Sequence, residues 1–292
     1  MNYAVVDTGS NTIRMSIYKY ESGCLDELFT EVVFANLAAH IEDNCLTEEG
    51  IDICCEAILY HKKKADEFKA DFHVFATAAI RNAENCDYVV KSVKAKAGIE
   101  LEILSGNDEG ELSFLGAVSD FPVTSGVMAD VGGGSSEVIL FKEGEIIAVQ
   151  SVPIGSLKAY KTFVSGEMPT KEEAKLIKEE ITKYLDKNSE FHNAKANDLC
   201  LVGGGVRAAN KLCKLILNRE YLSVEGVDAM LEAFCEDEKF LEVFEKVIPK
   251  RKLTITPGLC IYSAIGEYFG ADKIYISDKG IKEGYALKYL IH

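Results

Sequence analysis

A short pattern of residues that could hold a phosphate group occurs twice in the chain. The first copy is Asp7-Thr8-Gly9-Ser10-Asn11-Thr12-Ile13-Arg14, and the second is Asp130-Val131-Gly132-Gly133-Gly134-Ser135-Ser136-Glu137. Aligned without a gap, the copies share Asp at the first place, Gly at the third and Thr or Ser at the sixth. Glycine lets the backbone approach a ligand closely and adopt a positive φ, so such turns can direct N–H groups at anionic oxygens. The two copies therefore predict two phosphate-binding turns.

The last place of the pattern differs between the copies, with Arg14 in the first and Glu137 in the second. A bound phosphate needs a cation, whereas a water molecule that attacks phosphorus needs a carboxylate. We therefore expect Arg14 to hold an anion and Glu137 to help position a water molecule or a metal ion. The alternative for both copies is a tight hairpin turn that needs glycine for its geometry alone.

The carboxylate that opens each copy follows an apolar run and would end a buried strand. Mg²⁺ prefers one or two carboxylates together with substrate phosphates, so we expect Asp7 and Asp130 to bind Mg²⁺, with Mn²⁺ as an alternative ion. For Asp7, a carboxylate that caps its own turn is the competing interpretation.

The surrounding pattern predicts that each copy joins two strands at the start of an α/β domain. Further strands and helices alternate after each hairpin. They are preceded by a third apolar segment over 31–38 and include a helix over 47–68 with Thr47 as its N-cap. A capping box marks a helix from Thr170, and Thr256-Pro257 is expected to open another with Pro at its first position. We expect two α/β domains around a cleft, over residues 1–121 and 122–280, with a C-terminal helix over about 281–292 packing back onto the first.

Composition excludes several classes of protein. The net charge of −15 over 292 residues argues against a nucleic-acid-binding surface. No signal peptide and no apolar run of membrane-spanning length are evident, so we expect a soluble, cytoplasmic protein. The nine cysteines form no CxxC pair and the five histidines lack metal-ligand spacing, which favours reduced core thiols over a zinc site. The sequence leaves the oligomeric state open, and a homodimer is one candidate.

Arginine is rare in the chain, with five residues: Arg14, Arg81, Arg207, Arg219 and Arg251. Four of them lie within a few residues of a glycine-rich turn or a strand-to-helix junction, where a bidentate phosphate contact would be useful. We expect Arg14 and Arg81 to grip terminal phosphate oxygens, with a structural salt bridge at the domain interface as the alternative for each. Arg207 and the cluster Lys250-Arg251-Lys252 are candidates for tracking a longer phosphate chain, and the cluster could equally be a solvated patch.

Four motifs in order resemble the exopolyphosphatase / guanosine pentaphosphate phosphohydrolase (Ppx/GppA) family: residues 7–14, 76–85, 130–137 and 202–205. Further similarity lies at Ser105–Gly110, at Pro153–Gly155, at Arg251 and at Ser277–Gly284, so the resemblance spans nearly the whole chain. It implies two actin-like (ribonuclease H-like) ATPase-fold domains flanking a phosphate-binding cleft. The implied activity is release of terminal orthophosphate from inorganic polyphosphate or of the 5′-phosphate of guanosine pentaphosphate.

The resemblance also assigns residues. It puts Glu109 at the family's general-base position, although an acidic residue in the first turn of a helix is also favoured by the helix dipole. The residues expected to bind phosphate are Ser10, Asn11, Arg14, Arg81, Gly133, Gly134, Ser135, Gly204, Gly205 and Arg207. The chain departs from the family's pattern at Lys282, where arginine is usual.

Two other functions remain open at this point. An ATP-dependent small-molecule kinase would use the same fold, but no convincing adenosine pocket is evident in the sequence. A non-catalytic sensor of polyphosphate or guanosine pentaphosphate would have no reason to keep both Glu109 and Glu137. Polyphosphate and the guanosine nucleotide present the same terminal phosphoanhydride, so the residues do not choose between them.

Overall fold

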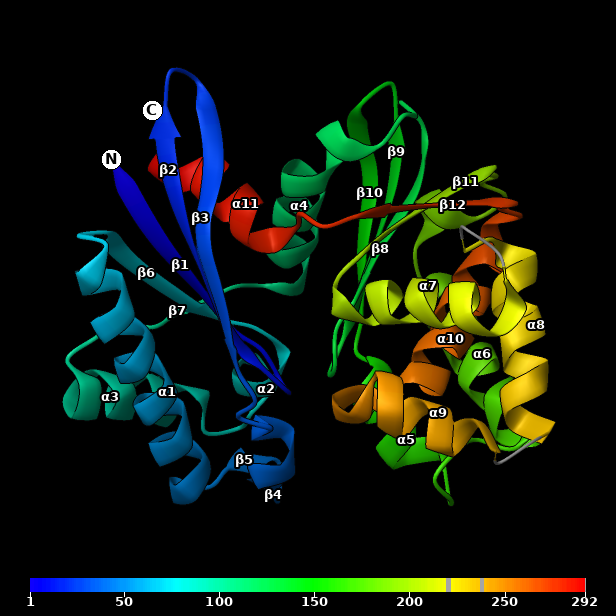
Figure 1. Ribbon diagram of the computed structural model, residues 1–292, viewed down its shortest axis with the longest axis horizontal. Helices are drawn as coiled ribbons and strands as arrows, with labels where there is room; N and C mark the ends of the chain where they lie inside the picture. The colour runs from blue at the N-terminus through cyan, green and yellow to red at the C-terminus, as the bar shows by residue number, and fades with distance from the viewer. Residues whose placement is uncertain (219–221, 237–238, 292) are drawn as a thin grey trace. The chain divides into compact units, whose positions relative to one another are not determined.

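The structure is a computed structural model that describes residues 1–218, 222–236 and 239–291 (Figure 1). Arg219 lies outside the described residues, as do residues 237 and 238 of the acidic helical region. The chain divides into two compact units, and each is described by itself. Unit 1 comprises Met1–Leu112 and Ile281–His292, and unit 2 comprises Ser113–Gly280.

Unit 1 is built on a five-stranded sheet in the order β3-β2-β1-β6-β7. Its strands are β1 (Asn2–Thr8), β2 (Ile13–Glu21), β3 (Cys24–Val33), β6 (Asp71–Ala76) and β7 (Glu102–Ile103). The first three are antiparallel neighbours, whereas β6 runs parallel to β1 and β7 parallel to β6. Strand β3 begins at Cys24 and includes only residues 31–33 of the apolar segment noted over 31–38. It is an edge strand with many exposed polar residues, so its sequence carries little apolar signal.

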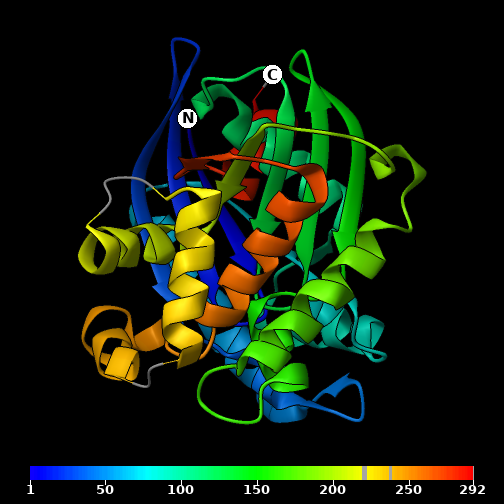
Figure 2. The same ribbon diagram turned by 90° about the vertical axis from the view of Figure 1, so that its right-hand side faces the viewer.

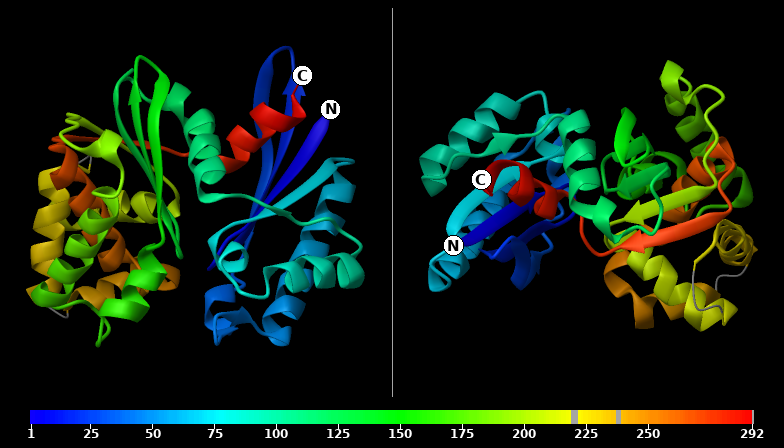
Figure 3. Two further views of the ribbon diagram at one scale, coloured as in Figure 1. Left: turned by 180° about the vertical axis from the view of Figure 1, so that it is seen from behind. Right: turned by 90° about the horizontal axis from the view of Figure 1, so that it is seen from above.

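Both faces of the unit 1 sheet are covered, as the alternation of side chains along a strand requires. On β1, Ala4 and Val6 join the core formed with α1 (Glu48–Glu67) and α3 (Cys86–Ala97). Val5 points to the opposite face, where it packs with α11 (Ile281–Tyr285). Figure 3 shows α11, in red, against the blue strands of this unit. The remaining short elements are β4 (Ile41–Glu42), β5 (Cys45–Leu46) and α2 (Ala78–Arg81).

Unit 2 repeats the same sheet order, β10-β9-β8-β11-β12. Its strands are β8 (Gly126–Val131), β9 (Ser136–Lys142), β10 (Glu145–Val152), β11 (Asp198–Val202) and β12 (Lys273–Ser277). Its helices are α5 (Ser156–Phe163), α6 (Lys171–Leu185), α7 (Gly204–Leu217), α8 (Val224–Glu236), α9 (Lys239–Val247) and α10 (Ile255–Phe269). Figure 2 looks onto α6, α8 and α10, which pack against one another in front of this sheet.

Several helix boundaries predicted from capping residues are confirmed. The Thr47 side chain accepts a hydrogen bond from the Gly50 N–H, and both halves of the capping box are formed at Thr170. Gly270 ends α10 in the left-handed region with φ 73°. Pro257 is the third residue of α10 rather than the first, because the helix already begins at Ile255.

The division between the units falls within α4 (Gly106–Ala117), before the boundary expected at residues 121 and 122. Leu112 belongs to the core cluster of Tyr18 and Phe75, whereas Phe114 and Ala117 belong to that of Met128 and Phe141. One helix therefore contributes to two cores, which a sequence boundary based on strand and turn signals does not capture. After Gly280 the chain returns to unit 1 with α11 and a π-helical segment, Ala286–Leu290.

Membrane-crossing helices are absent from the described part of the chain, since none combines the required length with sufficient apolarity.

Candidate functional site

The two glycine-rich turns have the same local structure. Each is a four-residue loop between antiparallel strands, over 9–12 in unit 1 and 132–135 in unit 2. In each, the first N–H donates to the carbonyl of the fourth residue, from Gly9 to Thr12 and from Gly132 to Ser135, both at 3.0 Å. The repeat seen in the sequence is thus a repeated hairpin.

The first glycine of each turn lies close to a carbonyl group across the turn. The positive φ expected for these glycines is not observed. A Cβ at Gly9 would lie 3.1 Å from the Thr12 carbonyl oxygen, and one at Gly132 would lie 3.3 Å from that of Ser135. Within the described part of the chain, the glycines with positive φ are elsewhere: Gly23, Gly98, Gly144, Gly203 and Gly270. A side chain at the first place of either turn would therefore require a small shift of the facing carbonyl group.

Neighbouring segments hold the carbonyl groups of both turns. In unit 1 the Ala38 N–H donates to the Ser10 carbonyl and the Asn36 N–H to that of Asn11, both at 2.9 Å. In unit 2 the first N–H groups of α5 donate to carbonyl groups of the turn. The Ser156 N–H donates to the Gly132 carbonyl at 2.9 Å. The Leu157 and Lys158 N–H groups both donate to the Gly133 carbonyl, at 3.0 and 2.9 Å.

The amide groups of the turns are left without such partners. Among the described residues, none accepts a hydrogen bond from the turn amides that follow the first glycine, which are those of Ser10, Asn11, Thr12, Gly133, Gly134 and Ser135. Backbone N–H groups are strong donors that are nearly always satisfied in proteins, and a run of them in a turn is a nest for an anion. Both turns are therefore suited to bind phosphate oxygens through their backbone.

The carboxylate that opens each turn lies directly opposite the residue that closes the pattern. Asp7 on β1 pairs with Arg14 on β2, and Asp130 on β8 pairs with Glu137 on β9. Residues directly opposite each other in antiparallel strands project from the same face of the sheet. The strand register thus places a cation beside the carboxylate in unit 1 and a second carboxylate beside it in unit 2.

In unit 2 both carboxylates accept hydrogen bonds from serines. The Ser113 hydroxyl donates to Asp130 Oδ2 at 2.6 Å, and the Ser151 hydroxyl donates to Glu137 Oε1 at 2.9 Å. Glu137 is 1% exposed. A buried carboxylate is costly unless it is hydrogen-bonded, so Ser151 helps to hold Glu137 in place. The sequence reasoning missed Ser113, whose position four residues after Glu109 in one helix was the available signal.

In unit 1 a second cation lies near Arg14. Arg14 Nε is buried and donates to none of the residues in the described ranges. Lys282 on α11 is partly buried, and burial lowers the pKa of its ammonium group, as does the positive charge of Arg14, whereas Glu283 and Asp7 raise it. Lys282 was noted in the sequence as a departure from the family's pattern. Because the chain returns to unit 1 after Gly280, Lys282 lies near Arg14 and adds a second basic group there.

Arg81 and Glu109 form an ion pair within unit 1. Arg81 Nη1 donates to Glu109 Oε2 at 2.6 Å and to the Leu104 carbonyl at 3.0 Å. Both side chains are largely buried, with exposed fractions of 15% and 13%. The residue expected to grip phosphate and the residue expected to act as base thus contact each other within unit 1, so this pair is not the salt bridge at the domain interface that was the alternative for Arg81.

The strand-to-helix turn at Gly203 lies beside Asp130. Gly203 has φ 97° and ψ 168°, a conformation that other residues rarely adopt, and a Cβ there would lie 3.2 Å from Asp130 Oδ1. It is the N-cap of α7 and provides no side-chain cap. Arg207 lies in the first turns of this helix, and its Nε is 3.5 Å from Asp278 Oδ1. The structure therefore places Gly203, which directly precedes Gly204 and Gly205, beside Asp130 in unit 2.

The cluster of basic residues at 250–252 is partly engaged by acidic ones. Lys252 Nζ lies 3.1 Å from Glu167 Oε1 and 2.7 Å from Glu245 Oε1. Arg251 ends a short 3-10 turn, Pro249–Arg251. Lys252 is therefore paired with two acidic side chains.

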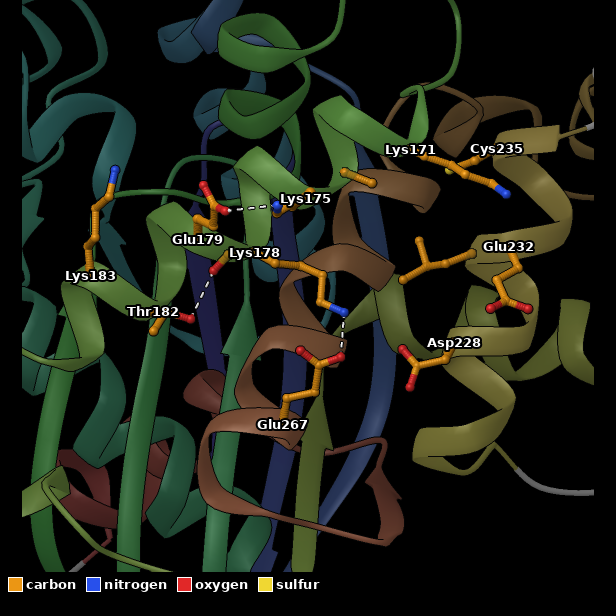
Figure 4. Close-up of a pocket in the computed structure, with 12 residues that line it drawn as sticks. Lys171, Lys175, Lys178, Glu179, Thr182, Lys183, Asp228, Glu232, Cys235 and Glu267 are labelled. Carbon is orange, nitrogen blue, oxygen red and sulfur yellow. Dashed lines mark hydrogen bonds and ion pairs between the residues drawn. The ribbon is translucent and has the colours of Figure 1, made fainter.

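The groove drawn in Figure 4 is a different feature of unit 2. It has a volume of about 860 Å³ and is lined by residues of α6, α8 and α10, none of which is a predicted site residue. Its lysines are paired with acidic neighbours, as Lys178 is with Glu267 at 2.5 Å and Lys175 with Glu179 at 3.8 Å. This groove is a balanced charged surface and does not belong to the site of the two turns.

The donor set around the turns suits a hard cation. No group of three or more His, Cys, Asp or Glu side chains in the described ranges is arranged as a ready-made metal site. Each unit instead presents one aspartate at the end of its central strand, Asp7 and Asp130. One or two carboxylates completed by substrate phosphates and water are what Mg²⁺ normally uses. These residues therefore fit Mg²⁺ that arrives with a phosphate substrate.

Comparison with known proteins identifies the family. The sequence model of the Ppx/GppA phosphatase family matches residues 16–291. The chain belongs to this family. This confirms the resemblance carried by the four ordered motifs.

Individual relatives agree with this assignment. The solved Aquifex aeolicus Ppx/GppA enzyme superposes with a TM-score of 0.80 and 27% identity, covering 98% of this chain and 99% of that one. Exopolyphosphatase 1 of Mycobacterium tuberculosis is 27% identical over 61% of this chain and 54% of its own length. The guanosine-5′-triphosphate,3′-diphosphate pyrophosphatase of Photobacterium profundum is 22% identical over 97% of this chain and 58% of its own.

The chain spans about half the length of the curated relatives that it matches. Its fold nevertheless agrees with the family over nearly all of its residues. The expected pair of actin-like, ribonuclease H-like domains is confirmed, and each unit has the corresponding sheet of five strands.

Proposed function

We propose that this protein hydrolyses the terminal phosphoanhydride bond of inorganic polyphosphate or of guanosine pentaphosphate and releases orthophosphate. The observation that carries the proposal is the set of turn amides that donate to no described residue, three in each unit. They occur in a member of the Ppx/GppA phosphatase family whose relatives are named for these two activities.

Substrate binding is assigned to the turns and the arginines. The amides of Ser10, Asn11, Gly133, Gly134 and Ser135 donate to phosphate oxygens, since these donors need no side-chain reorganisation. Arg14 adds a positive charge on the first turn, with Lys282 close by. In unit 2, Gly204, Gly205 and Arg207 bind a further phosphate of the substrate.

Catalysis is assigned to two carboxylates. Hydrolysis requires a water molecule in line with the leaving oxygen and a group that accepts its proton. Glu109 accepts that proton, and Glu137 orients the water molecule or the cation. Arg81 is paired with Glu109 at 2.6 Å in the structure, so the substrate phosphate competes with Glu109 for this guanidinium group.

Asp7 and Asp130 would hold Mg²⁺ together with phosphate oxygens of the substrate. When bound, the ion would offset the negative charge that builds up on the phosphoryl oxygens and the leaving group. The Ser113 hydroxyl keeps Asp130 in a fixed orientation for this role.

Release of orthophosphate by the purified protein tests the proposal. Wild type is assayed with Mg²⁺ on polyphosphate, guanosine pentaphosphate and ATP, beside Glu109→Gln. We expect hydrolysis of one or both of the first two substrates and a loss of about 10²- to 10⁴-fold in kcat in the variant. The matched control is Glu111→Gln on the same helix, whose carboxylate lies 3.6 Å from Lys288.

The outcomes separate the competing functions. Tight binding of polyphosphate or guanosine pentaphosphate without hydrolysis would identify a sensor. Transfer of phosphate from ATP to an acceptor would identify a kinase. Full turnover in Glu109→Gln would leave the hydrolase in place but remove Glu109 as its base.

A further inference from the structure

Tyr262 is a buried tyrosine of α10 whose hydroxyl group ends at the first turn of α7. Its side chain is 1% exposed. A Cβ added to Gly205 would lie 2.8 Å from the hydroxyl oxygen, so the tyrosine occupies the space that a side chain at 205 would need. Neither the ordered motifs nor the proposed function uses this residue.

The Tyr262 hydroxyl is a hydrogen-bond donor that the described part of the protein does not use. No side chain or backbone group in the described part of the chain forms a hydrogen bond with it. The hydroxyl oxygen is not one of the fully buried polar atoms that lack a partner, so it can donate to a ligand or to water at the start of α7. A ring needed for packing alone would not require the oxygen.

Other donors converge on the same place. Gly203 gives α7 no side-chain cap, and the amides of Gly204, Gly205 and Val206 bond to nothing within residues 1–218, 222–236 and 239–291. The N-terminal amides of a helix of this length favour an anion through their partial positive charge. The hydroxyl and the helix terminus therefore present donors to one position.

The charged groups that act on the Tyr262 hydroxyl are Arg251, Arg207 and Asp130. Burial raises the pKa of this hydroxyl well above its usual range, so the group stays protonated and can donate. Asp130 opposes an anion here, and Asp278 partly offsets Arg207 at 3.5 Å. Two arginines and the helix terminus outweigh these carboxylates.

We propose that the Tyr262 hydroxyl and the first amides of α7 together bind one phosphate group of the substrate, which makes Tyr262 a specificity-determining residue. The inference rests on the proposed function, because it takes the ligand to be a phosphoanhydride. The inference adds the Tyr262 hydroxyl as a hydrogen-bond donor to the substrate, a role that packing of the ring does not require. It also accounts for glycine at position 205, since any side chain there would displace the hydroxyl.

Binding of inorganic tripolyphosphate to the whole protein, measured by titration calorimetry, tests the inference. Tyr262→Phe removes the oxygen and keeps the ring. We expect its affinity to fall about ten- to a hundred-fold, the usual effect of losing a hydrogen bond to a charged group. Its melting temperature should change little, because the hydroxyl group forms no hydrogen bond to the described residues that the substitution could remove. In turnover the change should appear in KM more than in kcat.

Tyr268→Phe is the matched control. Tyr268 lies on the same helix, and its hydroxyl is 3.0 Å from Asp186 Oδ1 at the surface. The same chemical change at this site should leave tripolyphosphate affinity unchanged.

A second pair of variants tests the geometry at Gly205. Gly205→Ala should lower both the melting temperature and the affinity, because the added methyl group meets the Tyr262 hydroxyl. Adding Tyr262→Phe to this variant should restore the melting temperature but not the affinity.

The outcomes distinguish this inference from the function on which it rests. Wild-type affinity in Tyr262→Phe would overturn the role of Tyr262 and leave phosphoanhydride hydrolysis untouched. Failure of the wild-type protein to bind tripolyphosphate and to release orthophosphate from any substrate would overturn both.

Discussion

The two units carry the same hairpin turn but surround it differently. In each, one glycine N–H closes the loop at 3.0 Å, and an aspartate lies at the end of the strand that leads into it. The residue opposite that aspartate is Arg14 in unit 1 and Glu137 in unit 2. The two units thus share the backbone of the turn and differ at one position of the strand register. Under the proposed function, this position holds an anion in unit 1 and orients a water molecule or the cation in unit 2.

The turns also differ in what holds them. The start of a 3-10 helix, Leu37–His40 with Asn36 as its N-cap, supports the turn of unit 1 through the backbone N–H groups of Asn36 and Ala38. The turn of unit 2 lies against the start of α5, where a Cβ at Gly155 would come within 2.5 Å of the Gly132 carbonyl oxygen. The second turn is therefore the more tightly packed, as expected for the unit to which we assign the positioning of water.

Substitution of Gly9 within the unit 1 turn and of Gly155 beside the unit 2 turn should show this difference most strongly. Gly155→Ala forces backbone atoms of the unit 2 turn to move, so we expect a loss of about 10²-fold or more in orthophosphate release and a lower melting temperature. Gly9→Ala meets the Thr12 carbonyl at 3.1 Å, which a small adjustment relieves, and should cost about ten-fold or less.

Initial rates and thermal unfolding of the two glycine variants provide the check. Equal losses in both would mean that the turns are held equally firmly. A larger loss in Gly9→Ala would reverse the comparison.

The two units should also differ, by a smaller amount, in how much folding stability they lose as the pH falls. His61 of unit 1 is fully buried, with its Nε2 3.2 Å from the Ile13 carbonyl oxygen. Burial lowers the pKa of His61 below its usual value of about 6.5, although the Ile13 carbonyl and Glu31 act in the opposite direction. Below about pH 6.5 the unfolded chain takes up a proton that the folded unit resists, so stability is lost as the pH falls, by up to about 1.4 kcal/mol per pH unit.

Unfolding by urea at pH 7.5 and pH 5.5 measures this effect. We expect His61→Gln to flatten the decline attributed to unit 1. His192→Gln is the control, because His192 of unit 2 is exposed. The same decline in His61→Gln as in wild type would show that other groups cause it.

The sequence predicted the parts of the fold that depend on local signals. Helix starts at Thr47 and Thr170 and the helix end at Gly270 follow from caps that act within a few residues, and all three are confirmed. The paired hairpins follow from apolar runs interrupted by glycine. The first part of strand β3 was not predicted, because an exposed edge strand needs few apolar residues.

The features that the sequence did not reveal come from distant residues that fold together. Lys282 lies near Arg14 because α11 returns to the first sheet, and Tyr262 reaches Gly205 because α10 packs on α7. The pairing of Arg81 with Glu109 joins two residues that sequence reasoning gave separate roles. No spacing rule connects such residues, since only the packed core brings them into contact.

The division of roles between Arg14 and Glu137 is the central claim, and steady-state kinetics of Arg14→Gln and Glu137→Gln on polyphosphate test it most directly. We predict that Arg14→Gln raises KM about ten-fold or more with a smaller change in kcat, because a charged contact to phosphate is lost. Glu137→Gln should lower kcat by about 10²-fold or more and leave KM nearly unchanged. The same parameter changing in both variants would contradict a binding turn in unit 1 and a water-positioning turn in unit 2.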